Sequence, residues 1–110
     1  MEIKNYKDLT YTPLYDGVSA SETFAFNGFE AKVIRYEPGA RAPRHNHSGD
    51  NLKVVLQGEL RFNGQTTGHV GAMYPCSAQE GYWLEALPET YVLLVQEPGT
   101  KTVLIDEPTE

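Results

Sequence analysis

Cysteine is nearly absent from this sequence: Cys76 is the only one among 110 residues. A single cysteine forms no internal disulfide and cannot build a zinc module that relies on several thiolate ligands. A chain without disulfides is typical of a reducing compartment, so we expect a cytoplasmic location. The thiol of Cys76 is expected to fill a small buried space, as free cysteines usually do.

Long apolar runs are also missing. No segment approaches the ~20 consecutive apolar residues that a membrane-spanning helix requires. The first eight residues, Met1 to Asp8, are mostly polar and lack the apolar region of a secretory signal. We therefore expect neither a membrane span nor secretion.

Basic residues are few, with 9 Lys and Arg against 15 Asp and Glu, and the formal net charge is −6. They are spread along the chain and form no basic run. Proteins that bind nucleic acids need clustered positive charge to neutralise phosphates. The composition therefore disfavours a nucleic-acid partner.

No segment has the apolar spacing of a long amphipathic helix. Instead, 10 glycines and 7 prolines divide the chain into short segments rich in β-branched and aromatic residues. Asn27-Gly28 and Asn63-Gly64 are hairpin signals, because this dipeptide tolerates the positive φ angles of tight β-turns. Strands are expected at 22–26, 30–37, 43–47, 51–57, 59–63, 70–74, 80–86, 90–96 and 101–105.

Many short strands at regular spacing predict an all-β sandwich or barrel. The length is that of one domain, so we expect a single domain over residues 1–110. Residues 1–21 have weak strand content and are expected to form an arm that packs along the barrel or across a partner subunit. This arm and the open sheet edges make a homodimer the expected assembly.

The histidines carry the strongest functional signal. His45 and His47 are two of only three in the chain. At positions i and i+2 of an extended segment, both side chains point to the same face and come close enough to share one metal ion. The alternative is a pair of histidines on a surface loop. The third histidine, His69, lies in a glycine-flanked turn and is expected at the surface.

The residues around this pair resemble the first conserved motif of the cupin superfamily. The matching positions are Gly39, His45, His47, Asn51 and Gly58. About 25 residues further on, the segment from Gly68 to Tyr82 looks like a degenerate second motif. The resemblance spans residues 30–96 and implies a cupin-like double-stranded β-helix, which is a jelly-roll barrel.

In that family, the two histidines, a Glu and a histidine from the second motif bind a metal. Here Asn51 stands in place of the Glu, and Glu80 falls where the last histidine should be; a slip of one residue would put Gln79 there. The resemblance therefore implies that His45, His47 and Glu80 are ligands, with Asn51 adding a weak amide oxygen or orienting a water. Two imidazoles and a carboxylate are typical of non-haem Fe(II), and Ni, Mn or Zn would also fit. A chain with a degraded second motif can also have lost its ion.

Tyr82 and Arg35 are expected to shape the site or orient a substrate beside Glu80, which completes the candidate catalytic residues. Arg35 shares a strand face with Ala31 and Val33. If that face is internal, its planar guanidinium would clamp a carboxylate.

Three functions remain open at this point. The first is a metal-dependent enzyme, such as a dioxygenase, that acts on a small organic acid, diketone or sugar-derived substrate. The second is a non-catalytic module that binds or senses a small ligand or a metal. The third is a structural protein with no site. The implied set of two histidines and one carboxylate favours dioxygen chemistry.

Overall fold

The protein is described here by a computed structural model, which covers residues 2–105. This part of the chain contains twelve β-strands and one short 3₁₀ helix, η1 (Tyr6–Asp8). No helix in it is long and apolar enough to cross a membrane. The strands are β1 (Tyr11–Tyr15), β2 (Val18–Ser21), β3 (Phe24–Phe26), β4 (Phe29–Tyr36), β5 (Arg41–His47), β6 (Asn51–Gln57), β7 (Leu60–Phe62), β8 (Thr66–Gly68), β9 (Met73–Cys76), β10 (Tyr82–Ala86), β11 (Thr90–Gln96) and β12 (Thr102–Leu104).

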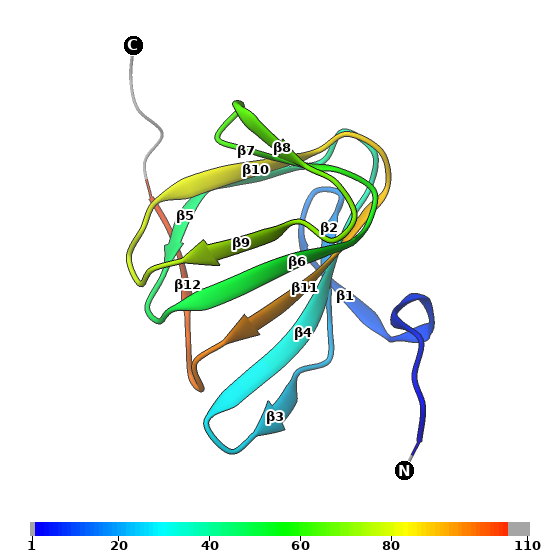
Figure 1. The fold of residues 1–110 in the computed structure, drawn as a ribbon, viewed down its shortest axis with the longest axis vertical. Coiled ribbons are helices and arrows are strands. Elements are labelled where there is room, and N and C mark those ends of the chain that lie inside the picture. The colour runs from blue at the N-terminus through cyan, green and yellow to red at the C-terminus, as the bar shows by residue number, and fades with distance from the viewer. Residues whose placement is uncertain (1, 106–110) are drawn as a thin grey trace.

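The strands form two antiparallel sheets that pack face to face (Figure 1). The larger sheet has the order β1-β2-β4-β11-β6-β9, and β3 also pairs with β4. The smaller sheet has the order β12-β5-β10-β7-β8. β1 to β4 all lie in the larger sheet, and from β4 onward the chain alternates between the sheets, except that β7 and β8 both lie in the smaller one. The all-β jelly-roll architecture expected from the sequence is confirmed.

Side-chain alternation sorts the residues of each strand between the core and the outside. In β6, Asn51, Lys53 and Val55 are buried, and the residues between them are partly exposed. In β11, Val92 and Leu94 also face the core. The inner face of β6 is therefore polar at the start of the strand, at Asn51 and Lys53, and this region contains the candidate site.

A β-bulge in β5 sets the direction of the histidines. Tyr82 of β10 pairs with His45, whereas Leu84 pairs with Ala42, so three residues of β5 span the length of two residues of β10. The extra residue resets the alternation, and both Ala42 and His45 are buried. Bulges commonly redirect a side chain beside a functional site.

The predicted strands at 51–57 and 90–96 match β6 and β11, and those at 30–37 and 43–47 match β4 and β5 within two residues. Two strands of the arm, β1 and β2, were not expected. β2 has the sequence VSAS, whose small polar residues give little strand signal, but it pairs with β4. Tertiary pairing overrides weak β-propensity. The arm packs along the larger sheet of its own chain.

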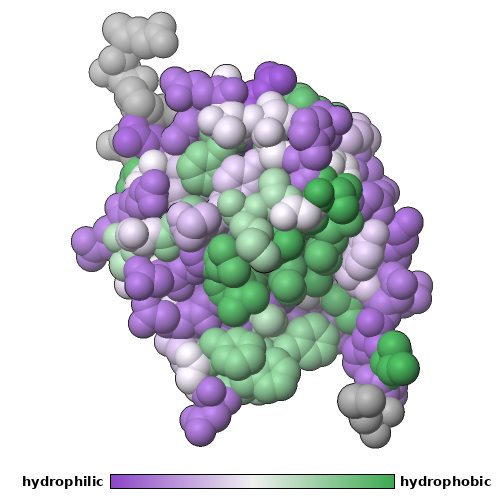
Figure 2. All heavy atoms as spheres, viewed as in Figure 1, coloured by the Kyte–Doolittle hydropathy of each residue, from purple (hydrophilic) through white to green (hydrophobic). Residues whose placement is uncertain are grey.

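The outer face of the larger sheet carries a contiguous apolar surface (Figure 2). The register places Met73 beside Val54 and Val54 beside Leu93 in one row across β9, β6 and β11. A second row contains Pro75, Leu52 and Val95. We call these six residues the outer apolar patch. One of them, Met73, is 64% exposed.

Candidate functional site

A cavity of about 50 Å³ lies between the two sheets. His45 and His47 of β5 line it from the smaller sheet. From the larger sheet it is lined by a cross-strand row of Lys53 in β6, Leu94 in β11 and Lys32 in β4, and Ile34 of β4 adds apolar surface. A few convergent polar groups in an apolar wall are characteristic of ligand sites. A cavity of this volume has room for a few water molecules or a ligand of a few heavy atoms.

The two histidines lie side by side inside the barrel. His45 is 5% exposed and His47 is 4% exposed, and their ring centroids are 5.0 Å apart. The structure thus places the imidazoles on one internal face and not on a surface loop. Their separation arises from the i, i+2 spacing at the end of β5, beyond the bulge.

Hydrogen bonds at Nδ1 orient both rings. Nδ1 of His45 lies 2.7 Å from the carbonyl oxygen of Pro43 and donates to it, so Nε2 of this ring carries the lone pair. Nδ1 of His47 lies 3.2 Å from Oγ1 of Thr102 in β12. Nε2 of His47 is buried and has no hydrogen-bond partner within residues 2–105.

Lys53 is the central residue that the sequence analysis missed. Its side chain lies inside the barrel and is 3% exposed. Nζ donates to Oδ1 of Asn51 at 2.6 Å and to the hydroxyl of Tyr82. It also lies 4.5 Å from the centre of the Tyr82 ring. Alternation along 51–57 places residue 53 on the same face as Asn51, so the signal was present in the sequence.

The electrostatics of the cavity are cationic. Burial lowers the pKa of Lys53 to about 8, although Cys76 and Glu80 oppose this shift through their charges. Burial, and secondarily the charge of Lys53, lower the pKa of His47 to about 3. Burial also lowers the pKa of His45. At neutral pH the site therefore holds two neutral imidazoles and the ammonium of Lys53, and Lys32, whose charge adds to the lowering of the His47 pKa, also lines the cavity.

Tyr82 is the residue of β10 that faces the histidines. It is 1% exposed and pairs with His45, and the two ring centroids lie 4.6 Å apart. Burial raises the pKa of its phenol well above the ordinary value, so the hydroxyl is protonated at neutral pH. Tyr82 thus packs against the histidines and Lys53, and a role in shaping a ligand site stays a prediction.

Glu80 does not join the histidines, contrary to the sequence-based expectation. It is exposed, and its Oε1 accepts a hydrogen bond of 3.2 Å from the backbone N–H of Ser77. Strand alternation was extended back to residue 80, but β10 begins only at Tyr82. The preceding turn contains Gln79 with φ of 68°, which breaks the alternation, and Gln79 is exposed as well.

Arg35 does not face the cavity either. Ile34 lines the cavity, so Arg35 belongs to the opposite face of β4. Its Nη2 donates to Oε2 of Glu89 at 2.8 Å, and Glu37 lies 3.8 Å away. Ala31 and Val33 share this outer face, where Val33 is buried and pairs with Leu93 of β11. The carboxylate clamp proposed for Arg35 is therefore an ion pair outside the site.

Asn51 is 7% exposed and contacts Lys53, but it lines an open hollow with Asp50 and Gln96 and is not one of the residues that line the cavity. Its Oδ1 is used by Lys53, and its Nδ2 is buried without a hydrogen-bond partner in the described part of the chain. Cys76 pairs with Asn51 across β9 and β6 and is buried, as expected for a filler. Burial raises the pKa of its thiol.

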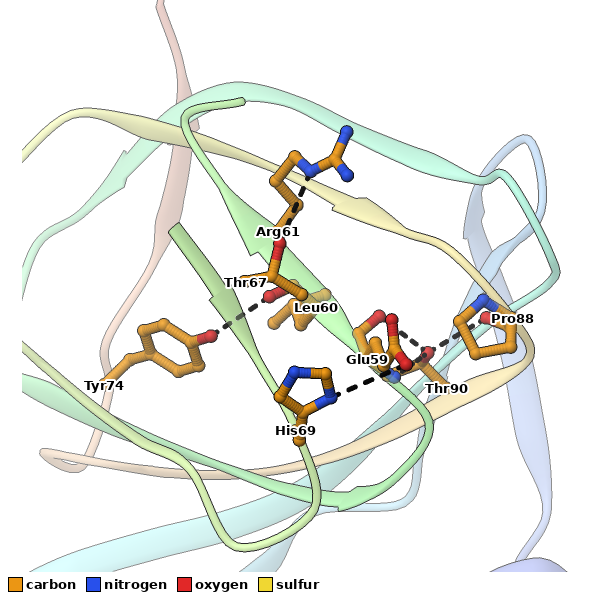
Figure 3. Close-up of polar contacts among 8 residues, drawn as sticks. All are labelled: Glu59, Leu60, Arg61, Thr67, His69, Tyr74, Pro88 and Thr90. Atoms are coloured by element: carbon orange, nitrogen blue, oxygen red, sulfur yellow. Dashed lines mark hydrogen bonds and ion pairs between the residues drawn. The ribbon is translucent and has the colours of Figure 1, made fainter. Parts of the chain in front are cut away.

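His69 lies far from this chemistry. Its side chain is 71% exposed and its Nδ1 lies 3.5 Å from Oε1 of Glu59 (Figure 3). The same view shows Tyr74 donating to the carbonyl oxygen of Leu60 at 3.0 Å, which ties β9 to the smaller sheet. His69 is a surface turn residue, as the sequence predicted.

Only part of the site fits a divalent metal ion. The paired imidazoles are suitable ligands. However, no group of three or more His, Cys, Asp or Glu among residues 2–105 is placed to hold an ion. The Asn51 oxygen is used by the Lys53 ammonium. For a divalent ion about 5 Å from that ammonium, the repulsion at an effective dielectric of about 20 is about 7 kcal/mol. In this arrangement the residues do not fit a tightly held metal.

The chain was compared with known proteins. No family model matches the sequence, and no curated protein matches it. Solved structures do match. A chain in the complex of Rhodobacter sphaeroides SigE with the anti-sigma ChrR has a TM-score of 0.75 and 21% identity over 86% of this chain. This chain spans about half of that one, with a coverage of 52%.

Two further structures have the same fold. An RmlC-like cupin from Shewanella frigidimarina has a TM-score of 0.73 and 14% identity, with 90% of this chain and 92% of that chain covered. Salicylate 1,2-dioxygenase from Pseudoaminobacter salicylatoxidans, solved with gentisate, has a TM-score of 0.69 and 16% identity, with 81% and 30% covered. The fold implied by the spacing around His45 and His47 is thus confirmed, and the chain adopts the cupin fold.

Proposed function

We propose that this cupin binds a small organic molecule in the cavity between its sheets. The observation that carries the proposal is the composition of the cavity wall. Its polar lining residues are His45, His47, Lys53 and Lys32, and apolar residues such as Ile34 and Leu94 lie among them. Burying polar groups is costly unless they gain partners, so a site that leaves Nε2 of His47 without one is suited to a ligand.

This function corresponds to the non-catalytic module considered from the sequence. The cavity volume of about 50 Å³ limits the ligand to a few heavy atoms, unless the side chains that line the cavity move. Tyr82 contacts both histidine rings, edge to face against His45 and tilted against His47. The fold similarity to a dioxygenase solved with gentisate, an organic acid, supports a small-molecule ligand for this fold.

The second candidate is a metal-dependent enzyme, such as a dioxygenase, with Fe, Ni, Mn or Zn. The paired imidazoles of His45 and His47 favour it. Such an ion would supply Lewis-acid or dioxygen chemistry. It would require Lys53 to leave the site and a third ligand to replace Glu80, which is exposed. The binding function needs neither change and is therefore preferred.

The assembly that we propose is a homodimer, and the outer apolar patch is the surface that supports it. Monomeric proteins rarely expose large contiguous apolar patches. The patch contains no charged residue, so two copies of a chain with a net charge of −6 can approach there without bringing like charges together.

The test of the binding function is a thermal-shift screen of small organic acids, amides, alcohols and ketones, followed by chemical-shift mapping. We expect at least one class to raise the melting temperature and to shift backbone signals of β5, β6 and β10. Ala42→Leu narrows the cavity, because Ala42 lines it, and should abolish the shift. His69→Ala, at the surface, is the matched control and should bind as the wild type does. Signals that move only outside these strands would contradict the proposal.

A further inference from the structure

The residues around Lys53 present hydrogen-bond donors that the protein does not use. Lys53, His47 and Asn51 are 3%, 4% and 7% exposed. An ammonium group has three N–H donors. Two of those on Lys53 go to Asn51 and Tyr82, which leaves one. Nδ2 of Asn51 has no partner within residues 2–105.

These groups are hydrogen-bond donors because of their chemical type. Ammonium and amide nitrogens only donate. Nε2 of His47 becomes a donor when the Thr102 hydroxyl, 3.2 Å from Nδ1, donates to that nitrogen. A ligand in the cavity that pairs with Lys53 and His47, which line it, must supply acceptor atoms. A carboxylate has two acceptor oxygens and can take several such bonds at once.

The charge balance points the same way. Within the described residues, no carboxylate forms an ion pair with Lys53, and Glu80 lies exposed at the turn before β10. A buried cation without a counter-charge is unfavourable, whereas a buried and hydrogen-bonded ion pair recovers much of that cost. An anion entering the cavity would supply the missing partner. Apolar lining residues such as Val18 and Ile34 suit a short hydrocarbon tail.

We propose that this cavity is a metal-independent site for a small monocarboxylate, in which the ammonium of Lys53 takes the place of the metal ion of other cupins. Lys53 and His47 hold the carboxylate, Asn51 positions Lys53, and the tail lies against the apolar lining residues. This inference rests on the proposed binding function and names its ligand class.

The first experiment compares acids with their neutral isosteres. Wild-type protein is titrated with acetate and propionate, and with acetamide and propionamide, by NMR at constant ionic strength. We expect the acids to bind at least ~10-fold more tightly than the amides, with shifts centred on β5 and β6. Equal affinity of acids and amides would overturn the carboxylate site while leaving the general binding function intact. No shift by any of the four compounds would overturn the carboxylate site as well, and the broader screen would then decide the binding function.

The second experiment uses Lys53→Met, which keeps the length of the side chain and removes its charge. The variant should lose the preference for acids, and Glu80→Gln, at the exposed turn, should keep it. Elemental analysis of the wild type, purified without a tag and dialysed against Zn²⁺ or Ni²⁺ at low micromolar concentration, should find well below one ion per chain. One tightly held ion per chain would overturn the proposal. The wild-type measurements decide the matter even if the variant does not fold.

Discussion

Tyr82 and His45 pair across β10 and β5, and their ring centroids lie 4.6 Å apart. This pairing holds the Tyr82 ring against His45, and the Tyr82 hydroxyl accepts a hydrogen bond from Lys53. The cross-strand contact therefore positions Tyr82 both as a neighbour of the histidines and as a partner of the buried ammonium.

Tyr82→Phe should lower the free energy of unfolding by about 1–3 kcal/mol, because it leaves a buried ammonium with one partner fewer. Urea unfolding monitored by circular dichroism measures this. Tyr74→Phe is the matched control, since its hydroxyl bonds to the neutral carbonyl of Leu60 and is only partly buried. The loss for Tyr74→Phe should be smaller, about 1 kcal/mol. If both variants lose the same amount, the hydroxyl of Tyr82 does not support Lys53.

Stability should fall in mild acid because the histidines are buried in the neutral form. The pKa of His47 is about 3 in the folded chain and about 6.5 when unfolded. Below pH ~6.5 the unfolded chain takes up a proton that the folded chain does not, so the free energy of unfolding decreases as the pH falls toward 3. At pH 5 this loss is about 2 kcal/mol for His47.

His47→Gln tests this loss by removing the titrating group. The drop in unfolding free energy between pH 7 and pH 5 should be smaller in the variant than in the wild type by about 2 kcal/mol. His69→Gln removes an exposed imidazole and should leave the drop unchanged. Equal drops in the wild type and His47→Gln would show that His47 is not buried neutral.

The fold was predictable from residues whose signal is local. Turn residues such as Asn63-Gly64, both with positive φ angles, mark the hairpin between β7 and β8. The apolar runs of β6 and β11 are long enough to specify their own bounds. β2 was not predictable, because its Ser and Ala residues become a strand only by pairing with β4.

The site was predictable only where strand alternation holds. His45 and His47 lie on one strand, so their common direction follows from the spacing. Glu80 lies in a turn, where the backbone direction depends on the left-handed φ of Gln79 and cannot be read from parity. Whether Arg35 points inward or outward depends on which face of β4 meets the core. Alternation alone does not show which face that is.

Two substitutions should turn this cavity into a metal-binding site. Asn51→Glu combined with Lys53→Met would restore the acidic residue of the first motif and remove the competing charge. We expect this double variant to bind about one Co²⁺ per chain with the visible absorption of a protein-bound ion, through His45, His47 and residue 51. Calorimetry gives the stoichiometry.

Asn51→Glu alone is the informative control, because the Lys53 ammonium would pair with the new carboxylate and compete with the metal ion for it. It should bind Co²⁺ at least ~10-fold more weakly than the double variant. Equal binding by the two variants would show that Lys53 does not oppose a metal ion in this cavity.

The proposed homodimer is tested at the outer apolar patch. Met73 is 64% exposed and lies beside Val54 in the register of β9 and β6. We expect the wild type to have twice the mass of one chain by sedimentation equilibrium, and Met73→Glu to have the mass of one, because a charge would be buried at the contact. Leu104→Glu is the matched control, since Leu104 is 59% exposed on β12 of the other sheet and should leave the dimer intact. A wild type of single-chain mass at micromolar concentration, or a dimer that survives Met73→Glu, would exclude this surface as the dimer contact.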